Sequence, residues 1–437
     1  MRYVIIGSGV AGMSAVEAIR SVDGAGEVVM VSEDPHGYYS RPGLAYYLTG
    51  ELPDKALYLR SRGDAKKMNL TFLNARVTRI LRTEHALELD SGKSRLAYDK
   101  LLIAVGAQAV PLQVPGAALQ GVVKLDHMND ARSILNQARR GRTAVVVGGG
   151  ITALELTEGL LARGMKVIYL LRGDRYWANV LDPHESQIVE KRLAEEGVTL
   201  RHHAELAEIL GRGGKVAGVR LKDGQTIRCE LLAYAIGIRP RMELVAEAGL
   251  EVERGILVDE HLQTSAPDIF AAGDVAQAFD PLSGRAVLDS LWNPAREQGH
   301  AAGLNMAGRR MAYLKSAPFN VTRLAGLTTT IIGTVGHGRD EDVFGIARGD
   351  SETWRDLPHA LVAQSGFDVN HMRLLIGERT LIGAVLIGDQ TLSWPLQKMI
   401  AGSADITPIR DGLLAPNAPI ADLIAAYWME WRKQVAL

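Results

Sequence analysis

The chain has 437 residues, 47% hydrophobic and 23% charged, which is long enough for two or three globular domains. Its formal net charge of -1 gives no reason to expect a nucleic-acid or anionic-membrane partner. The sequence holds no run of about 20 apolar residues that would predict a membrane span. The first expected strand begins at Arg2 without a leader, so we expect a cytoplasmic protein. The single cysteine, Cys229, excludes an internal disulfide, a dithiol redox pair and a cysteine-ligated cluster.

The first 33 residues predict a strand, a helix and a second strand, in the segments RYVIIG, GVAGMSAVEAIRS and EVVMVSE. Between the first strand and the helix the spacing is Gly7-x-Gly9-x-x-Gly12. Gly7 permits a tight turn, Gly9 leaves room for a pyrophosphate, and Gly12 lets the helix pack closely on the strand. Glu33 ends the second strand, where an acid accepts hydrogen bonds from ribose hydroxyls. This unit therefore predicts a dinucleotide site.

A second unit of the same kind follows in TAVVVGG, GITALELTEGLLARG and KVIYLLR. Its turn has Gly148 and Gly150, with the permitted alanine at the third position of the pattern. The place of the ribose-binding acid is taken by Leu171, which is followed by Arg172 and Arg175. An arginine pair there would bind a 2′-phosphate and favour NADPH, whereas the alternative is that both arginines are solvated surface residues. The sequence leaves the choice between NADH and NADPH open.

Further apolar runs ending in glycine occur at 98–107, 229–238 and 268–274. After about residue 318 the pattern changes to antiparallel strands, at 327–336, 371–378 and 380–389, and to a closing amphipathic helix at 421–434. The fold class that we expect is α/β, with two Rossmann-like dinucleotide-binding domains and a smaller α+β C-terminal domain.

These motifs resemble those of the FAD-dependent pyridine nucleotide-disulfide oxidoreductase superfamily. TSAPDIFAAGD (264–274) resembles its second FAD fingerprint, which implies that Asp274 hydrogen-bonds the ribityl chain. LLIAVGA (101–107) and YAIGIRP (234–240) resemble the strand ends at which the chain changes domain. The family usually has Pro-Asn after the latter, so Arg241 is a departure, expected at a nicotinamide-side loop. LWNPAREQGHAAGLNMAG (291–308) resembles the helix after the fingerprint and implies that Trp292 lies near the flavin pyrimidine.

The resemblance implies a discontinuous FAD domain at 1–113 and 244–318, an NAD(P)H domain at 114–243, and a C-terminal domain at 319–437 for dimerisation and flavin covering. The expected FAD-binding residues are Gly7, Gly9, Val10, Ala11, Gly12, Glu33, Arg41, Pro42, Val77, Ala104, Gly106, Gly273, Asp274 and Trp292. The expected NAD(P)H-binding residues are Gly148, Gly150, Ile151, Thr152, Glu155, Arg172, Arg175 and Gly237.

Disulfide reductases of this superfamily carry a flavin-adjacent thiol in the segment that here reads GYYSRPGLAYYLTGELP (37–53), without cysteine. The segment instead resembles the cysteine-free branch of rubredoxin reductases, ferredoxin reductases and the flavin portion of nitrite reductases. That branch implies a flavin or phosphate contact for Arg41, whose alternative is a surface charge at a helix N-terminus. Arg41 and Glu155 are the candidates nearest the flavin and the nicotinamide, and Cys229 is expected to be buried and inert.

The implied function is an FAD-dependent NAD(P)H:acceptor oxidoreductase that passes a hydride from NAD(P)H to FAD. Electrons then go to a second acceptor, expected to be a small iron–sulfur protein such as rubredoxin or ferredoxin. The alternatives are an oxidase that uses oxygen and a flavin-bearing, nucleotide-binding subunit of a larger redox complex. His36 and the pair His202-His203 lack metal-ligand spacing, so no metal site is expected. We also expect the protein to form a homodimer.

Overall fold

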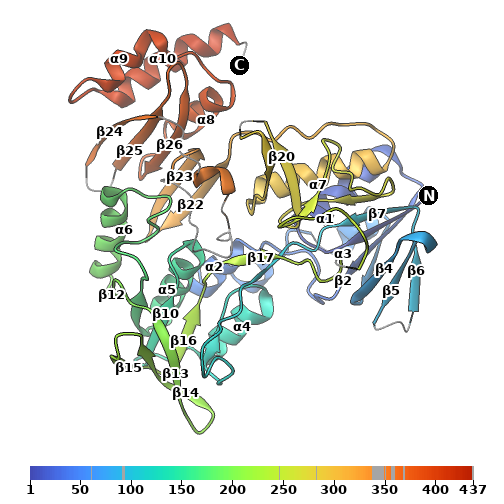
Figure 1. The fold of residues 1–437 in the computed structure, drawn as a ribbon, viewed down its shortest axis with the longest axis horizontal. Coiled ribbons are helices and arrows are strands. Elements are labelled where there is room, and N and C mark those ends of the chain that lie inside the picture. Colours follow the sequence, from blue (N-terminus) through green and yellow to red (C-terminus); the bar gives the residue numbers. More distant parts are fainter. Residues whose placement is uncertain are drawn as a thin grey trace.

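The computed structural model describes residues 1–60, 62–90, 94–245, 247–281, 283–336, 349, 351–355, 360–367 and 370–435. Three units are visible in Figure 1. A first α/β unit combines the blue N-terminal part of the chain with the yellow segment from the middle, and a second α/β unit is green. A C-terminal unit, orange to red, lies above the second unit in this view. The predicted fold class, two Rossmann-like domains and a smaller α+β domain, is confirmed.

The first unit is built on a parallel sheet with strand order β19-β7-β1-β2-β3. Both faces of the sheet are covered, because Val4 and Ile5 point to opposite faces of β1 and are both fully buried. Helices α1 and α7 pack against each other so closely that a Cβ on Gly299 would lie 2.1 Å from the Ala11 carbonyl oxygen. The main elements are β1 (Arg2–Ile6), α1 (Val10–Val22), β2 (Glu27–Ser32), β3 (Leu70–Asn74), β7 (Lys100–Ile103), β19 (Ile269–Ala271) and α7 (Trp292–Met306).

Two small sheets and four short helices complete the first unit. The sheets are β4 (Val77–Leu81), β5 (Ala86–Leu89) and β6 (Ser94–Ala97), and β18 (Ile256–Leu257), β20 (Ala276–Asp280) and β21 (Arg285–Val287). The helices are α2 (Gly43–Thr49), η1 (Asp54–Leu57), α3 (Arg62–Lys67) and η2 (Arg82–Glu84).

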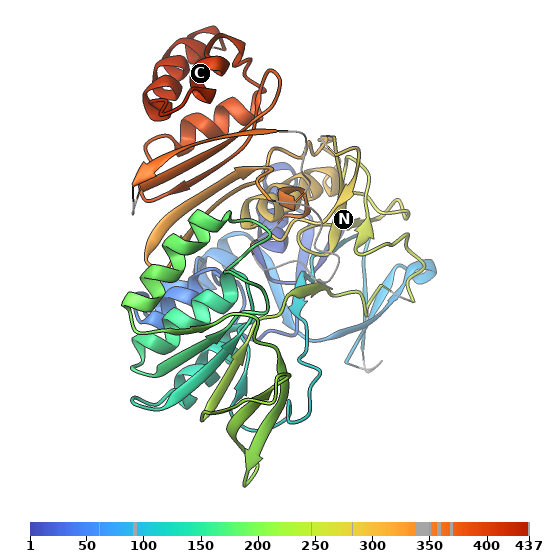
Figure 2. The same ribbon diagram turned by 60° about the vertical axis from the view of Figure 1, so that its left-hand side comes forward.

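The second unit, teal to green in Figure 2, repeats the arrangement of a sheet with helices. Its parallel strand order is β12-β11-β10-β16-β9. Its elements are β9 (Val122–Val123), α4 (Met128–Gln137), β10 (Thr143–Val147), α5 (Ile151–Ala162), β11 (Lys166–Leu170), α6 (Pro183–Glu195), β12 (Thr199–Arg201) and β16 (Leu231–Tyr234). An antiparallel sheet of β13 (Leu206–Arg212), β14 (Lys215–Leu221) and β15 (Thr226–Arg228) packs beside them.

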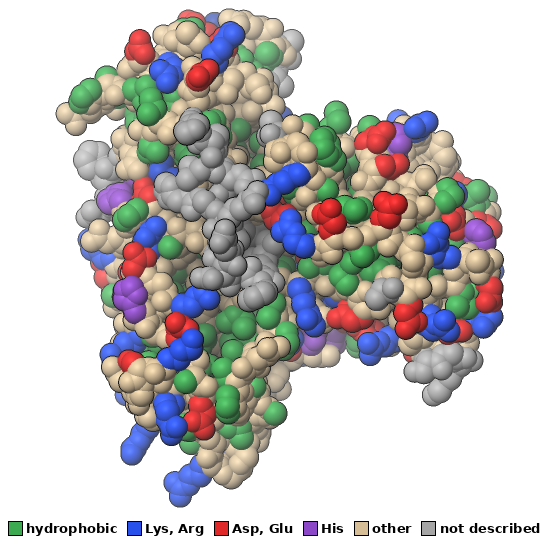
Figure 3. Space-filling view, viewed as in Figure 1, with side chains coloured by type: hydrophobic (Ala, Val, Ile, Leu, Met, Phe, Trp, Pro, Cys, Tyr) green, Lys and Arg blue, Asp and Glu red, His purple; other side chains and the backbone are tan. Residues whose placement is uncertain are grey.

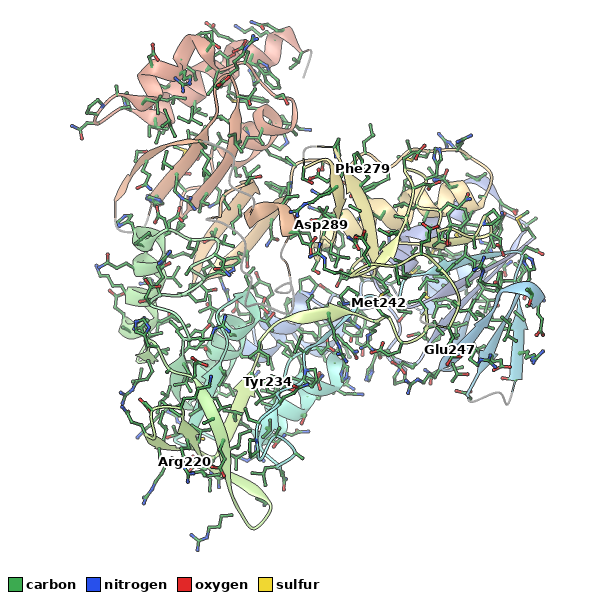
Figure 4. The ribbon with its side chains drawn as sticks, in the orientation of Figure 1. Arg220, Tyr234, Met242, Glu247, Phe279 and Asp289 are labelled. Carbon is green, nitrogen blue, oxygen red and sulfur yellow. The ribbon has the colours of Figure 1, made fainter. Side chains whose placement is uncertain are left out.

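The chain crosses between the first and second units twice, and the two crossing segments pair with each other. Strands β8 (Ala107–Ala109) and β17 (Ile238–Pro240) form an antiparallel ribbon. Figure 4 shows Met242 just beyond this ribbon, between Tyr234 in the second unit and Glu247 in the first. The two crossings are thus hydrogen-bonded to each other.

The C-terminal unit is an antiparallel sheet with order β22-β23-β26-β25-β24, covered by helices α8, α9 and α10. The predicted strands correspond to β23, β25 and β26, which are the three central strands, and the predicted helix to α10. The elements are β22 (Phe319–Leu324), β23 (Leu327–Gly333), η3 (Glu352–Arg355), β24 (Leu361–Phe367), β25 (Asn370–Ile376), β26 (Leu381–Ile387), α8 (Ser393–Ala401), α9 (Thr407–Leu414) and α10 (Ile420–Gln434).

A buried ion pair joins the C-terminal sheet to the second unit. Arg373 on β25 donates from Nε and Nη2 to the two carboxylate oxygens of Glu185 on α6, at 2.8 and 2.9 Å. Asp182, Glu185 and His371 bring three ligand-type atoms within 4.8 Å of one another, as a metal site would. The Arg373 guanidinium already bonds both oxygens of Glu185 and supplies the positive charge, so we interpret the group as an ion-pair cluster.

Acidic and basic side chains are interleaved over the first unit on the face shown in Figure 3, in keeping with the near-zero net charge. None of the helices in the described parts of the chain combines the length and the apolar character that a bilayer crossing needs.

Candidate functional site

A cavity of about 760 Å³ opens where the strands of the first sheet end, and the first glycine turn forms part of its wall. Gly7 has a φ of +110°, and a Cβ on it would lie 2.2 Å from the Ala104 carbonyl oxygen, so this turn requires glycine. A Cβ on Gly9 would meet no heavy atom within 4 Å. Gly9 therefore leaves its side of the cavity open, as a closely approaching phosphate requires.

Helix α1 begins at this wall, and its N-cap residue Gly9 provides no side-chain hydrogen bond. The free N–H groups of the first turn and the positive end of the helix dipole are thus directed at the cavity. Such an end binds anions well. The wall fits the pyrophosphate of a dinucleotide.

Most of the residues predicted for FAD line this first cavity. They are Gly7, Gly9, Val10, Ala11, Glu33, Arg41, Val77, Ala104, Gly106, Gly273 and Asp274. Gly12, Pro42 and Trp292 are not among the lining residues. A Cβ on Gly12 would lie 2.2 Å from the Gly7 carbonyl oxygen, so this glycine serves close packing. Trp292 is 39% exposed at the first residue of α7, so the structure does not bring it to the cavity.

Arg41 lies among oppositely charged groups in this cavity. Enclosure by the cavity walls opposes its charge, but Tyr39 and the carboxylates of Asp126 and Asp274 outweigh that effect and raise the pKa of Arg41. The Arg41 guanidinium therefore stays positively charged where an anionic cofactor would bind.

Several cavity residues were not predicted from the sequence, namely Tyr39, Lys124, Asp126, His127, Asn129 and Arg241. Arg241 was expected at a nicotinamide-side loop, whereas it lines the first cavity and not the second. Strand β17 pairs antiparallel with β8, with Pro240 opposite Ala107, and this carries the next residue back to the first unit. There the Arg241 guanidinium donates to Glu33 and to the Ala107 carbonyl oxygen, each at 3.4 Å. Its departure from the family pattern was the visible signal, whereas no motif marks Asp126.

A second cavity, of about 490 Å³, adjoins the second glycine turn. Gly148 has a φ of +146°, and a Cβ on it would lie 2.2 Å from the Ala235 carbonyl oxygen. Helix α5 begins here with Gly150 as an N-cap that lacks a side-chain hydrogen bond. The buried Thr152 hydroxyl has no hydrogen-bond partner among the described residues. These features fit a second phosphate-bearing ligand.

Six of the residues predicted for NAD(P)H line this second cavity: Gly148, Gly150, Thr152, Arg172, Arg175 and Gly237. Two others do not. Ile151 is buried in the hydrophobic core, and Glu155 is half-buried on α5 and lines neither cavity. A place for Glu155 near the flavin or the nicotinamide stays a prediction.

The two arginines after β11 differ in their contacts. Arg172 is exposed, whereas Arg175 donates to both oxygens of Asp174 at 3.1 Å and to the Ala178 carbonyl oxygen at 3.3 Å. Glu205 also lines the cavity and pairs with Lys222. The cavity thus offers an arginine pair for a 2′-phosphate and a carboxylate for ribose hydroxyls.

One residue, Ala109 in β8, lines both cavities. The cysteine is elsewhere, because Cys229 is buried in the core beneath the β13–β15 sheet and lines neither cavity. Burial raises the pKa of its thiol to about 12. A redox reaction between the two ligands therefore has no thiol beside it.

Comparison with known proteins identifies the family. The pyridine nucleotide-disulphide oxidoreductase family matches residues 1–299. The rubredoxin-NAD(+) reductase of Ectopseudomonas oleovorans is 33% identical over 296 residues, which is 67% of this chain and 77% of that protein. The assimilatory nitrate reductase electron transfer subunit of Bacillus subtilis is 27% identical over 418 residues, which is 95% of this chain and 51% of that protein. The chain thus spans about half the length of this larger relative.

The fold is also that of solved reductases. A chain in the crystal structure of the covalent putidaredoxin reductase–putidaredoxin complex superposes with a TM-score of 0.85, at 24% identity, covering 97% of this chain and 98% of that one. Together with the family match, the two glycine turns and the two adjoining cavities have one explanation. The chain belongs to the pyridine nucleotide-disulphide oxidoreductase family and is an FAD-dependent NAD(P)H oxidoreductase.

Proposed function

We propose that the protein transfers electrons from NAD(P)H, through FAD, to a small iron–sulfur protein of the rubredoxin or ferredoxin class. FAD, when bound, accepts two electrons as a hydride and releases them singly. The balance is one NAD(P)H and two oxidised one-electron acceptors giving NAD(P)⁺, two reduced acceptors and one proton. The observation that carries this proposal is that two cavities, each beside a glycine turn, share the lining residue Ala109, while the sole thiol, Cys229, lies outside both.

The contribution of the chain is to hold and orient both ligands. The first cavity would hold FAD, with Glu33 at its adenosine ribose, Asp274 at its ribityl chain and Arg41 at its flavin or phosphate. The second would hold NAD(P)H, with α5 directed at its pyrophosphate. Two ligands fixed side by side react as though at very high concentration, which is the main effect available to the protein here.

The expected division into an FAD domain (1–113 and 244–318), an NAD(P)H domain (114–243) and a C-terminal domain (319–437) belongs to the same proposal. The predicted homodimer and cytoplasmic location stay predictions. The preference between NADH and NADPH follows from whether Arg172 and Arg175 or Glu205 contacts the ribose.

Anaerobic stopped-flow mixing of the FAD-loaded protein with NADH and, separately, NADPH tests the proposal. Bleaching of the flavin absorbance is expected with at least one nucleotide, and reoxidation should then be faster with rubredoxin or ferredoxin than with oxygen. No bleaching at millimolar nucleotide would refute the hydride step. Rapid reoxidation by oxygen alone would instead identify an oxidase.

A second candidate is a flavin-bearing subunit of a larger redox complex. It is favoured by the match of 95% of this chain to about half of a relative that is described as an electron transfer subunit. An isolated protein that turns over with an added iron–sulfur acceptor would argue against this candidate.

A further inference from the structure

One wall of the first cavity carries five side chains of alternating charge, in the order Arg41, Asp126, Arg241, Glu33 and Arg76. The distances between charged atoms are 4.0 Å from Arg41 to Asp126, 3.8 Å from Asp126 to Arg241, 3.4 Å from Arg241 to Glu33 and 3.7 Å from Glu33 to Arg76. All five line the cavity.

The centre of this row is a buried carboxylate. The Asp126 side chain is only 3% exposed, and besides the two arginines it has Lys124 at 3.8 Å and the Ala109 N–H at 3.3 Å. A carboxylate beside an anionic ligand opposes binding unless cations outnumber it, and three cations lie within 4.0 Å of this one. We therefore interpret the buried Asp126 carboxylate as a group that positions a neighbouring cation.

Of the three cations beside Asp126, Arg241 lies nearest the adenosine end of the cavity. Glu33 directly follows β2, where the ribose of a dinucleotide is expected, and Asp274 follows β19 on the ribityl side. Arg241 lies between Glu33 and Asp126, and its side chain is 25% exposed, so its guanidinium is partly desolvated and restrained on both sides. A restrained guanidinium suits a pyrophosphate, since little rotamer freedom is lost on binding.

We propose that Arg241 binds the pyrophosphate in the ADP half of FAD, and that Asp126 is the positioning residue that holds the guanidinium there. The assignment rests on FAD occupying the first cavity. Arg241 directly follows β17, the segment that crosses back from the second unit next to Met242 (Figure 4). Bound FAD therefore also fixes one of the two crossings between the units.

Arg241→Met in the full-length protein tests the contact. Loss of a charge-assisted hydrogen bond should weaken FAD about tenfold or more, measured as FAD fluorescence released on dilution of the holoprotein. Binding of ADP to flavin-depleted protein, measured by calorimetry, should weaken by a similar factor, whereas binding of riboflavin, which has no phosphate, should change by less than about twofold. Arg241→Lys keeps the positive charge but lacks the planar guanidinium with its paired N–H donors, so its affinity for FAD should lie between those of wild type and Arg241→Met.

The matched control is Arg239→Met, two residues earlier on β17. Arg239 has a side chain 55% exposed, lies 3.9 Å from Glu243 and lines neither cavity. FAD and ADP affinities in Arg241→Met equal to those in Arg239→Met would overturn the proposal, as would an equally large loss of riboflavin affinity in Arg241→Met. If Arg241→Met does not fold, the same comparison of FAD and ADP affinities is made between Arg241→Lys and an Arg239→Lys control, and equal affinities would again overturn the proposal.

Asp126→Asn tests the positioning role through the sign of its effect. If Asp126 holds Arg241, the variant should bind FAD several-fold more weakly, although it removes a negative charge from an anion site. The loss should be smaller when Arg241 is already methionine. Tighter FAD binding in Asp126→Asn, or an equal loss in both backgrounds, would overturn the role of Asp126.

Discussion

The glycines of the first turn perform two different tasks although they lie within six residues. Gly12 has no room for a side chain because of the protein itself, since its Cβ would lie 2.2 Å from the Gly7 carbonyl oxygen. Gly9 has room in the protein alone and lacks it only when a phosphate approaches. The sequence pattern predicts both glycines, but only the structure separates packing from ligand clearance.

We expect Gly9→Ala to fold with nearly unchanged thermal stability but to bind FAD at least tenfold more weakly, a loss of about 1.4 kcal/mol. Gly12→Ala should instead lower the melting temperature of the protein itself, because the α1–β1 contact must open. Thermal denaturation without flavin, alongside FAD titration, separates the two effects. Equal destabilisation by both substitutions would contradict this division.

Glu158 is a residue whose ionisation opposes folding. It lies on α5, accepts the Gly326 N–H at 3.2 Å, and has its pKa raised to about 7, chiefly by burial. Since the folded pKa exceeds the unfolded value, the native state favours the proton. The contribution to stability is therefore complete below about pH 4.5 and is lost as the pH rises through 7.

Glu158→Gln mimics the protonated acid, so the variant should be more stable than wild type at pH 8, by roughly 1–3 kcal/mol, and equal to it near pH 4. Chemical denaturation at several pH values measures the difference. The exposed Glu195 on α6 provides the control as Glu195→Gln. A pH-independent difference would show that the Glu158 carboxyl is not titrating in this range.

In the C-terminal sheet, the two strands that the sequence did not predict are the edge strands. β22 and β24 flank the C-terminal sheet, and Val321 and Leu361 are each 52% exposed there. Edge strands contact a neighbour on one side only, so their sequences lack the continuous apolar runs that predict β23, β25 and β26. The join between sheet and second unit was likewise beyond prediction, because Arg373 and Glu185 are 188 residues apart.

Removing one partner of that join leaves a buried charge unpaired. Arg373→Met should destabilise the protein by about 3–5 kcal/mol, whereas the exposed pair of Arg379 and Asp405 should give less than about 1 kcal/mol for Arg379→Met. Urea denaturation measures both. Similar small losses would mean that Arg373 contributes no more than a surface charge.

The same join predicts acid sensitivity. Burial favours a high pKa for Glu185, but His371, Arg373 and the Asp182 N–H outweigh it and lower the pKa. A depressed folded pKa means that this stability is present above the unfolded pKa and is lost as the pH falls through the folded one. The difference in stability between wild type and Arg373→Met should therefore shrink in acid.

For the molecule as a whole, the fold class was predictable because the two glycine turns, the fingerprint at 264–274 and the spacing between them are local signals. The cavity wall that contains Asp126 and Arg241 was not, since it forms only when the β8–β17 ribbon brings separate segments together. The single cysteine excluded a redox-active disulfide within the chain from the sequence alone.

Because the lone thiol is remote from both cavities, Cys229→Ala should leave the rate of flavin bleaching by NAD(P)H unchanged. It should cost about 1 kcal/mol of stability through the small void left in the core. Stopped-flow reduction, compared with denaturation of the same preparation, makes the check. A large fall in the bleaching rate at full FAD occupancy would show that the Cys229 thiol takes part in flavin reduction.

The position of β19 has a consequence for biosynthesis. β7 pairs with β1 on one side and with β19 on the other, and the paired residues Leu101 and Ile269 are 168 positions apart in the chain. Every strand of the second sheet, by contrast, lies between residues 122 and 201 or in β16 at 231–234. As the chain emerges from the ribosome, the second sheet can close while the first still exposes an unpaired edge at Leu101–Ile103. Nascent chains arrested before residue 269 should therefore bind chaperones through the first unit, although most of that unit is synthesised before the second.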